Sequence, residues 1–169
     1  GTYIECTGSF DLVTPPINCW NKQGHGSLDI REAIEQSCNV FFTTIGFELG
    51  KDSEGNFSEA RSLGMLQKYA SLMGLDQKTG IEISEASPQV SDKNAVPSYI
   101  GQGTNAFTTS QLARYASTIA TSGTIYKLSL LDRVTDSKGK LIKEYPSETA
   151  GQLDLSSNIW DDIHDGMYR

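Results

Sequence analysis

Three short stretches of this sequence combine residue types that could do chemistry. Ser37-Cys38-Asn39 places a hydroxyl and an amide two residues apart, directly before Val40-Phe41-Phe42. Ser137 precedes Lys140 by three residues, a spacing at which a helix could set a serine nucleophile beside a lysine base. Lys78-Thr79-Gly80 joins a cation to a hydroxyl. Each pattern is short enough to arise by accident. The three stretches must therefore be judged by the secondary structure in which each is expected to lie.

The second and third stretches are predicted to be accidental matches. The serine-to-lysine stretch lies in the expected turn of a hairpin, where the two side chains cannot lie one helical turn apart on one face. Glu82 and Glu85 follow the other stretch, and their charges would oppose binding of a substrate carboxylate. We therefore expect a surface turn there, with Lys78 and Ser137 exposed and remote from Ser37.

The first stretch lies in the strongest helical pattern of the sequence, residues 29–49. Apolar and small residues recur there at helical spacing: Ile30, Ala33, Ile34, Ser37, Cys38, Phe41, Phe42 and Ile45. Asp29 and Glu32 resemble a capping box, and Gly50 is a natural end.

Weaker patterns predict the remaining elements. Helices are expected at 58–73, 109–122 and from Ser156 or Ser157 onward; a short strand at 81–83; and a hairpin of 125–135 with 140–145. In the helix at 109–122, we expect Leu112, Tyr115, Ala116, Ile119 and Ala120 to face inward. Residues 1–27 are expected to be irregular, and most of 75–107 to be loop. No linker divides the chain, so residues 1–169 are predicted to belong to one domain.

Composition excludes several classes of function. The 169 residues carry 14 basic and 21 acidic side chains, for a net charge of −7, and the basic residues form no cluster. Nucleic acid is therefore not an expected partner, because phosphate contacts need lysine and arginine on one face. The sequence also lacks an apolar run approaching the roughly 20 residues that span a bilayer.

The three cysteines, Cys6, Cys19 and Cys38, leave two interpretations open. All three could be small buried thiols, or Cys6 and Cys19 could form a disulfide with Cys38 free. Neither C-x-x-C nor paired histidine is present, so we predict that the chain holds no metal and no cofactor. His25 lies between two glycines and is interpreted as a loop-packing residue, not a base.

The residues around Ser37-Cys38-Asn39 strengthen the interpretation of this first stretch as a functional motif. The turn His25-Gly26, a short helix, Ser37-Cys38-Asn39 and the pair Phe41-Phe42 together resemble the second active-site motif of class B penicillin-binding proteins. Further segments resemble other parts of that family in the same order: Thr79–Glu85, Ile100–Gly103 with Phe107–Ala113, and Trp160–Met167. The stretches Cys6-Thr7-Gly8 and Cys19-Trp20 look like Gram-positive members.

This resemblance implies an α+β fold that is mainly helical: a partial β-lactamase/transpeptidase-like fold, with a helical subdomain and a hairpin but without the main sheet. It implies a fragment of a serine-type D,D-transpeptidase that cross-links peptidoglycan stem peptides and binds β-lactams. Ser37 and Asn39 would be its catalytic residues, while the S-x-x-K nucleophile and the true K-T-G would lie elsewhere, so that the isolated fragment is inactive. Stem peptides ending in D-Ala-D-Ala, β-lactams and the remainder of the domain would be the partners.

The family works outside the cytoplasm, which implies the extracytoplasmic face of the bacterial membrane, an anchor upstream of this chain, and conditions in which a Cys6–Cys19 disulfide persists. Two alternatives remain. One is a fragment of a serine β-lactamase or β-lactam sensor, and the other is a non-catalytic secreted helical binding module.

The resemblance and the periodicity disagree about the backbone at Ser37. In one unbroken helix, residues two apart project about 200° apart, so Ser37 and Asn39 would point in opposite directions. A shared catalytic cleft requires the helix to break. We therefore predict two helices joined at or around Ser37-Cys38-Asn39.

Overall fold

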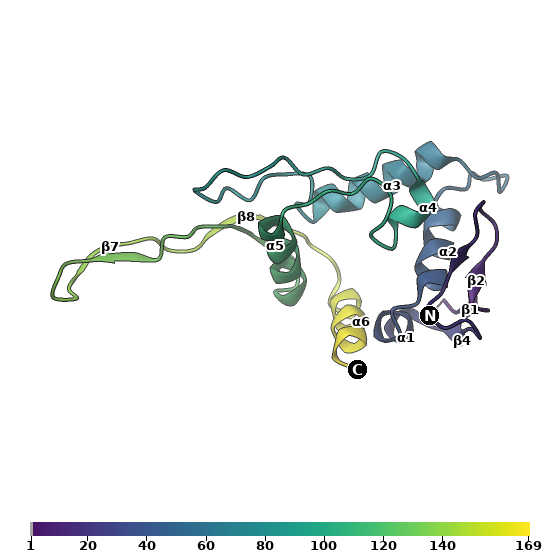
Figure 1. The fold of residues 1–169 in the computed structure, drawn as a ribbon. Coiled ribbons are helices and arrows are strands. Elements are labelled where there is room, and N and C mark those ends of the chain that lie inside the picture. Colours follow the sequence, from purple (N-terminus) through teal and green to yellow (C-terminus); the bar gives the residue numbers. More distant parts are fainter. Residues whose placement is uncertain (1) are drawn as a thin grey trace. The chain divides into compact units, whose positions relative to one another are not determined.

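A computed structural model describes residues 2–169, which form an α+β fold with six helices among them (Figure 1). The helices are α1 (Ile30–Glu35), α2 (Asn39–Leu49), α3 (Glu59–Leu72), α4 (Ala95–Ser98), α5 (Thr109–Ala120) and α6 (Ser157–Tyr168). Within this part of the chain, none of the helices has the length and apolar character needed to cross a membrane. The predicted helices are all present, and α4 is an addition inside the expected loop.

The strands are short and pair only in twos within the described residues. They are β1 (Ile4–Cys6), β2 (Ser9–Phe10), β3 (Ile17–Asn18), β4 (Gly26–Leu28), β5 (Thr124–Lys127), β6 (Arg133–Thr135), β7 (Leu141–Glu144) and β8 (Glu148–Gln152). All four pairs are antiparallel: β1 with β4, β2 with β3, β5 with β8 and β6 with β7. As expected, residues 2–169 contain no large sheet.

Three expectations about strands were wrong. Residues 2–27 contain three short strands and the start of a fourth, β4, and are not simply irregular. The expected strand at 125–135 is two strands, β5 and β6, and β5 pairs with β8 instead of continuing the hairpin. Residues 81–83 form no strand. Period-two patterns of two to five residues carry too little information to identify such elements.

The residues group into two compact units. Unit 1 comprises 1–70, 89–106 and 155–169, and unit 2 comprises 71–88 and 107–154. The chain leaves unit 1 and returns to it twice.

The core of unit 1 surrounds α2. Its buried members include Phe10, Leu28, Ala33, Val40 and Phe41, each 6% exposed or less, together with all three cysteines. Aromatic rings extend this core, since Phe47 stacks on Phe57 at 4.6 Å and meets Phe10 edge-on at 5.6 Å between ring centroids. The ribbons β1–β4 and β2–β3 bury their residues against α2 and do not rely on their own pairing.

Helix α6 packs along α1 in the same unit (Figure 1). The guanidinium of Arg31 donates two hydrogen bonds to one carboxylate oxygen of Asp162, at 2.8 and 2.5 Å, and pairs with Asp165 at 3.5 Å. Gly166 allows the close approach, because a Cβ there would lie 2.8 Å from the backbone oxygen of Arg31 and 3.0 Å from Cβ of Ile34.

Unit 2 is organised around a buried polar face of α5. Thr108 caps this helix in a capping box with Gln111. Arg114 is 3% exposed, and its guanidinium donates to the backbone oxygens of Lys78 (3.0 Å), Gln77 (2.8 Å) and Gly74. The arginine thereby fixes the turn that follows α3.

The predicted inward face of α5 was therefore wrong for three of its five residues, while Tyr115 and Ile119 are half-buried. Leu112 is 49% exposed, and Ala116 and Ala120 are exposed as well, whereas the buried residues are Gln111, Arg114 and Thr118. Periodicity identifies the apolar face of a helix but not the surface that the helix packs against. In this chain the polar face of α5 is the buried one, because Arg114 hydrogen-bonds backbone carbonyl groups within residues 74–78.

Substitution of Gly166, with Gly64 as the control position, tests the α1–α6 packing. Gly166→Ala should lower the free energy of unfolding by about 1–3 kcal/mol, because the added methyl overlaps Arg31 and Ile34. Gly64 lies in α3, where an added methyl would have no atom within 4 Å, so Gly64→Ala should raise the free energy of unfolding by about 0.5–1 kcal/mol. Urea unfolding measures both, and a neutral Gly166→Ala would contradict the described packing.

Replacement of Arg114 tests the polar core of unit 2. Arg114→Lys keeps the charge but cannot reach three carbonyl oxygens in a planar fork, so unfolding should become easier by about 2–4 kcal/mol. The exposed Arg133, which pairs only with its neighbour Asp132, is the control, and Arg133→Lys should change stability by less than about 0.5 kcal/mol. Equal effects of the two variants would show that the buried carbonyl contacts do not matter.

Candidate functional site

The backbone breaks between α1 and α2 at the Ser37 stretch, as predicted. The N–H of Ser37 donates to the oxygen of Ile34 at 3.1 Å, and that of Cys38 donates to the oxygen of Ala33 at 3.0 Å. These two bonds have the Schellman pattern that ends a helix, with Ser37 at the left-handed position. Cys38 is the extended N-cap of α2, and Asn39 is its first residue. The predicted capping box at the start of α1, Asp29 with Glu32, and the end of α2 at Gly50 are also present.

Ser37 occupies a backbone conformation that usually belongs to glycine. Its φ is +46°, where a residue with a Cβ atom costs about 1–2 kcal/mol. The residue is exposed, and its hydroxyl makes no hydrogen bond to any described residue. Backbone strain of this kind persists where the surrounding structure enforces it, and it concentrates at functional sites.

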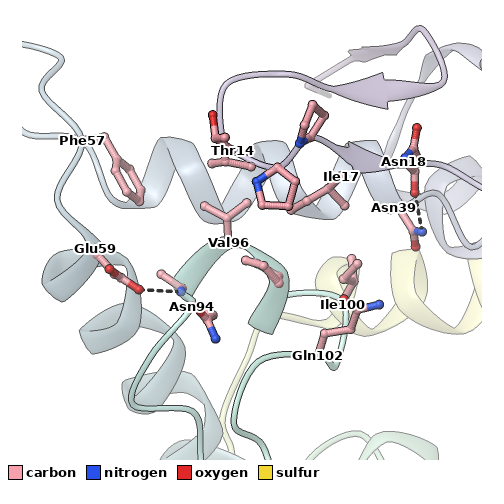
Figure 2. Close-up of a pocket in the computed structure, with 15 residues that line it drawn as sticks. Thr14, Ile17, Asn18, Asn39, Phe57, Glu59, Asn94, Val96, Ile100 and Gln102 are labelled. Carbon is pink, nitrogen blue, oxygen red and sulfur yellow. Dashed lines mark hydrogen bonds between the residues drawn. The ribbon is translucent and has the colours of Figure 1, made fainter.

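Asn39 is half-buried at the N-terminus of α2. Its side-chain amide donates to the backbone oxygen of Asn18 at 3.1 Å, which ties the residue to the end of β3 (Figure 2). One amide hydrogen and the side-chain carbonyl oxygen remain available for another partner.

The side chain of Asn39 lines a pocket of about 490 Å³ in unit 1 (Figure 2). Thr14–Asn18 form one part of the wall, and Asn94–Pro97 with Ile100 and Gln102 form another. In Figure 2, Glu59 and Asn94 lie on the side opposite Asn18 and Asn39, where Glu59 accepts the N–H of Ala95 at 3.2 Å. Ser37 is only two residues from Asn39 but does not line this pocket.

Gln102, in the middle of the Gly-Gln-Gly stretch, lines the same pocket as Asn39. Sequence reasoning identified this stretch as a family feature without assigning it a place. Glu59 and Asn94 were missed altogether, and nothing in their local sequence marks them, because Glu59 begins α3, Asn94 precedes α4, and only the fold brings them to one pocket.

The three cysteines and His25 form a buried cluster that was not predicted. All four potential ligand atoms lie within 4.8 Å of one another. His25 Nδ1 is 3.5 Å from the sulfur of Cys6 and 3.6 Å from that of Cys19, and the Cys19 and Cys38 sulfurs are 4.0 Å apart. Trp20 packs edge-on against the imidazole at 5.0 Å between ring centroids, and its indole N–H donates to the oxygen of Gln36 at 2.7 Å.

This cluster bears on the interpretations of the three cysteines. Cys6 and Cys19 lie close together, as predicted, and all three cysteines are buried free thiols, which is the first of the two interpretations; Cys38 joins the other two. The spacing argument against a metal considered only ligands a few residues apart, and these four side chains come from more distant positions. Cys6 and Cys19 are separated by 13 residues, as are His25 and Cys38, and the fold closes both loops. The cluster's four side chains are of the types that bind zinc.

The two thiols at the N-terminus of α2 differ in acidity. Burial raises the pKa of Cys38 to about 12, although the N–H of Phe41 works against this shift. Burial also opposes ionisation of Cys19, but hydrogen bonds from the backbone N–H groups of Val40, Asn21 and Asn39 outweigh it and lower the pKa.

The other two stretches belong to unit 2, whereas Ser37 and Asn39 belong to unit 1. Lys78 and Ser137 are both exposed, as predicted, and Ser137 lies in the hairpin turn that follows β6. Thr79, however, is fully buried and not part of a simple surface turn. Its hydroxyl donates to Glu85 at 3.0 Å. Burial opposes ionisation of Glu85, but hydrogen bonds from Ser110 and Thr79 outweigh it and lower the carboxyl pKa.

Comparison with known proteins identifies the family and the fold of the chain. The family model of the penicillin-binding protein transpeptidase domain matches residues 7–169. Penicillin-binding protein 2A of Bacillus subtilis (strain 168) is 27% identical over 164 residues, which are 87% of this chain and 22% of the relative. Peptidoglycan D,D-transpeptidase MrdA of Salmonella typhimurium (strain SL1344) is 29% identical over 166 residues, 88% of this chain and 24% of the relative. The chain thus spans about a quarter of the length of these relatives.

Solved structures show the same fold. Penicillin-binding protein 2B of Streptococcus pneumoniae (strain 5204) superposes with a TM-score of 0.80 at 22% identity, over 99% of this chain and 30% of the other. Penicillin-binding protein A of M. tuberculosis, solved as an acyl-enzyme complex, gives a TM-score of 0.75 at 18% identity, over 98% of this chain and 37% of the other. Since the family model matches nearly all of its residues, the chain belongs to the penicillin-binding protein transpeptidase domain family.

Proposed function

We propose that this chain is the part of a peptidoglycan D,D-transpeptidase that contributes the second active-site motif, with Ser37 and Asn39 as its catalytic residues. The observation that supports this most strongly is the strained break at Ser37. A helix that simply ended there would use glycine at the left-handed position, whereas this chain keeps a hydroxyl there at a cost in stability.

The geometry suits each residue to a role. The Ser37 hydroxyl is exposed and has no partner among residues 2–169, so it is free to pass a proton between an attacking serine and its leaving group. Asn39 is anchored through one amide hydrogen and keeps its other polar groups free, so it can hold the amide of a bound peptide. The pocket beside Asn39 would receive part of that peptide.

The remaining chemistry comes from outside this sequence. In the proposed reaction, a serine elsewhere in the domain attacks the carbonyl of a terminal D-Ala-D-Ala unit, expels D-alanine and forms an acyl-enzyme. An amine of a second stem peptide then takes the acyl group and frees the serine. A β-lactam would be trapped at the acyl-enzyme stage. We place the longer protein at the extracytoplasmic face of the bacterial membrane, where its substrate is.

The first test uses the chain alone and a longer protein with the complete transpeptidase domain. Residues 1–169 alone should form no stable adduct with fluorescent penicillin, as measured by intact mass, whereas the longer protein should be labelled once. A stoichiometric adduct of the short chain, on Ser137 above all, would overturn the proposal that the nucleophile lies elsewhere. In the longer protein, Ser37→Ala should slow acylation by about 10²- to 10⁴-fold. Ser137→Ala, in the exposed hairpin turn, is the matched control and should leave the rate unchanged.

A second test separates the catalytic role of Ser37 from a structural one. Ser37→Gly relieves the left-handed strain of about 1–2 kcal/mol but makes the unfolded chain more flexible by about 0.5–1 kcal/mol. The free energy of unfolding should therefore rise by up to about 1 kcal/mol while acylation slows as much as in Ser37→Ala. A stabilised Ser37→Gly variant with a normal acylation rate would show that the hydroxyl has no part in the reaction.

A further inference from the structure

We propose that Cys6, Cys19, His25 and Cys38 bind one zinc ion that holds the N-terminal strands to the start of α2. The catalytic roles of Ser37 and Asn39 do not enter this inference, which rests on the four side chains alone.

Three of the six distances between ligand atoms are close to those of a tetrahedral site, and all six are 4.8 Å or less. With zinc–sulfur bonds of about 2.3 Å and zinc–nitrogen bonds of about 2.0–2.1 Å, the edges of the tetrahedron are about 3.8 Å between sulfurs and about 3.6 Å from sulfur to nitrogen. The structure has 4.0 Å between the Cys19 and Cys38 sulfurs, and 3.5 and 3.6 Å from His25 Nδ1 to Cys6 and Cys19. A disulfide would require two of these sulfurs to approach to about 2.05 Å.

The imidazole is placed as a ligand would be. His25 Nδ1 points at two sulfurs, whereas Nε2 is buried and has no hydrogen-bond partner among the described residues. A buried nitrogen without a partner destabilises the fold, so packing alone does not explain why a histidine occupies this position. A bond from Nδ1 to a metal would leave Nε2–H without a partner, but its free energy would offset that cost.

The surroundings suit the charge of the complex. Three thiolates and one Zn²⁺ carry a net charge of −1, which must be balanced in a core of low polarity. The backbone N–H groups of Asn39 and Val40 hydrogen-bond Cys19, and that of Phe41 hydrogen-bonds Cys38. These are unpaired donors of the first turn of α2, whose positive end faces the sulfurs.

The topology explains what a metal would do. Cys6 ends β1, Cys19 follows β3, His25 precedes β4 and Cys38 caps α2. Strands of two or three residues are not stable by themselves, so both ribbons need an outside constraint. One ion would join the four segments and fix Cys38 between Ser37 and Asn39. Binding free energy then becomes folding free energy for residues 4–50.

The test measures metal directly in the full 169-residue chain, produced with zinc and purified under reducing conditions. Inductively coupled plasma mass spectrometry should find one zinc per chain. Cobalt substitution should give thiolate charge-transfer bands and the intense visible bands of a tetrahedral site. Cys6→Ser, Cys19→Ser, Cys38→Ser and His25→Gln should each lose the metal. His164→Gln changes the other histidine, which stacks on Trp160 in α6, and should keep it.

A measurement on the unaltered chain does not depend on whether the variants fold. Removing zinc with a chelator should lower the melting temperature and speed amide hydrogen exchange in residues 4–50, but not in the β6–β7 hairpin, and added zinc should reverse both effects. The inference is overturned if the chain purified with zinc present contains none. It is also overturned if intact mass shows two of the cysteines already joined in a disulfide, or if the chelator leaves exchange unchanged.

Discussion

The start of α2 is the constraint on which most of unit 1 depends. The helix cannot continue back into α1, because the chain reverses at Ser37 and the Schellman bonds close α1 there. Its first free N–H groups meet the sulfurs of Cys19 and Cys38, while Trp20 binds the last carbonyl of the preceding turn. Residues 19–20, which follow β3, thus give a partner to each of two neighbouring helix ends. Displacing the β2–β3 ribbon would remove a hydrogen-bond partner from each of them.

The two units bury different kinds of side chain in their small cores. Unit 1 gathers sulfur and aromatic side chains around α2, where Phe41 and Cys38 are almost completely buried. Unit 2 instead buries Gln111, Arg114 and Thr118, and each of these polar groups is matched to a carbonyl. A buried polar core of this kind tolerates substitution poorly, because removing one partner leaves the other unsatisfied. It also holds Thr79 and Glu85 in a network, which explains why a lysine-threonine-glycine stretch can be present without being available to a substrate.

The sequence predicted the features that depend on local rules. Asp29 with Glu32 and Gly50 mark helix ends through backbone hydrogen bonding, and all of them were identified correctly. The break at Ser37 followed from a geometric argument about two side chains, not from propensity. Features that depend on distant pairing were missed: the partner of β5, the polar face of α5, and the meeting of Cys6, Cys19, His25 and Cys38. For the cluster, the signal was the repeated 13-residue separation, which acquires meaning only once the turns between the ribbons are known.

The strained backbone conformation of Ser37 depends on the anchoring of its neighbours, Cys38 among them. A residue with a side chain stays at φ +46° only if its neighbours leave it no alternative. On one side, the hydrogen bonds of α1 hold the backbone through Ile34 and Ala33. On the other, Cys38 is fully buried among sulfurs, and Asn39 is bound to Asn18. The exposed hydroxyl of Ser37 is therefore presented by a backbone fixed at both ends, whereas a serine in a flexible turn would sample many positions. Because catalysis depends on preorganised groups, the cysteine–histidine cluster would support the proposed catalytic roles of Ser37 and Asn39 by holding the residue between them in place.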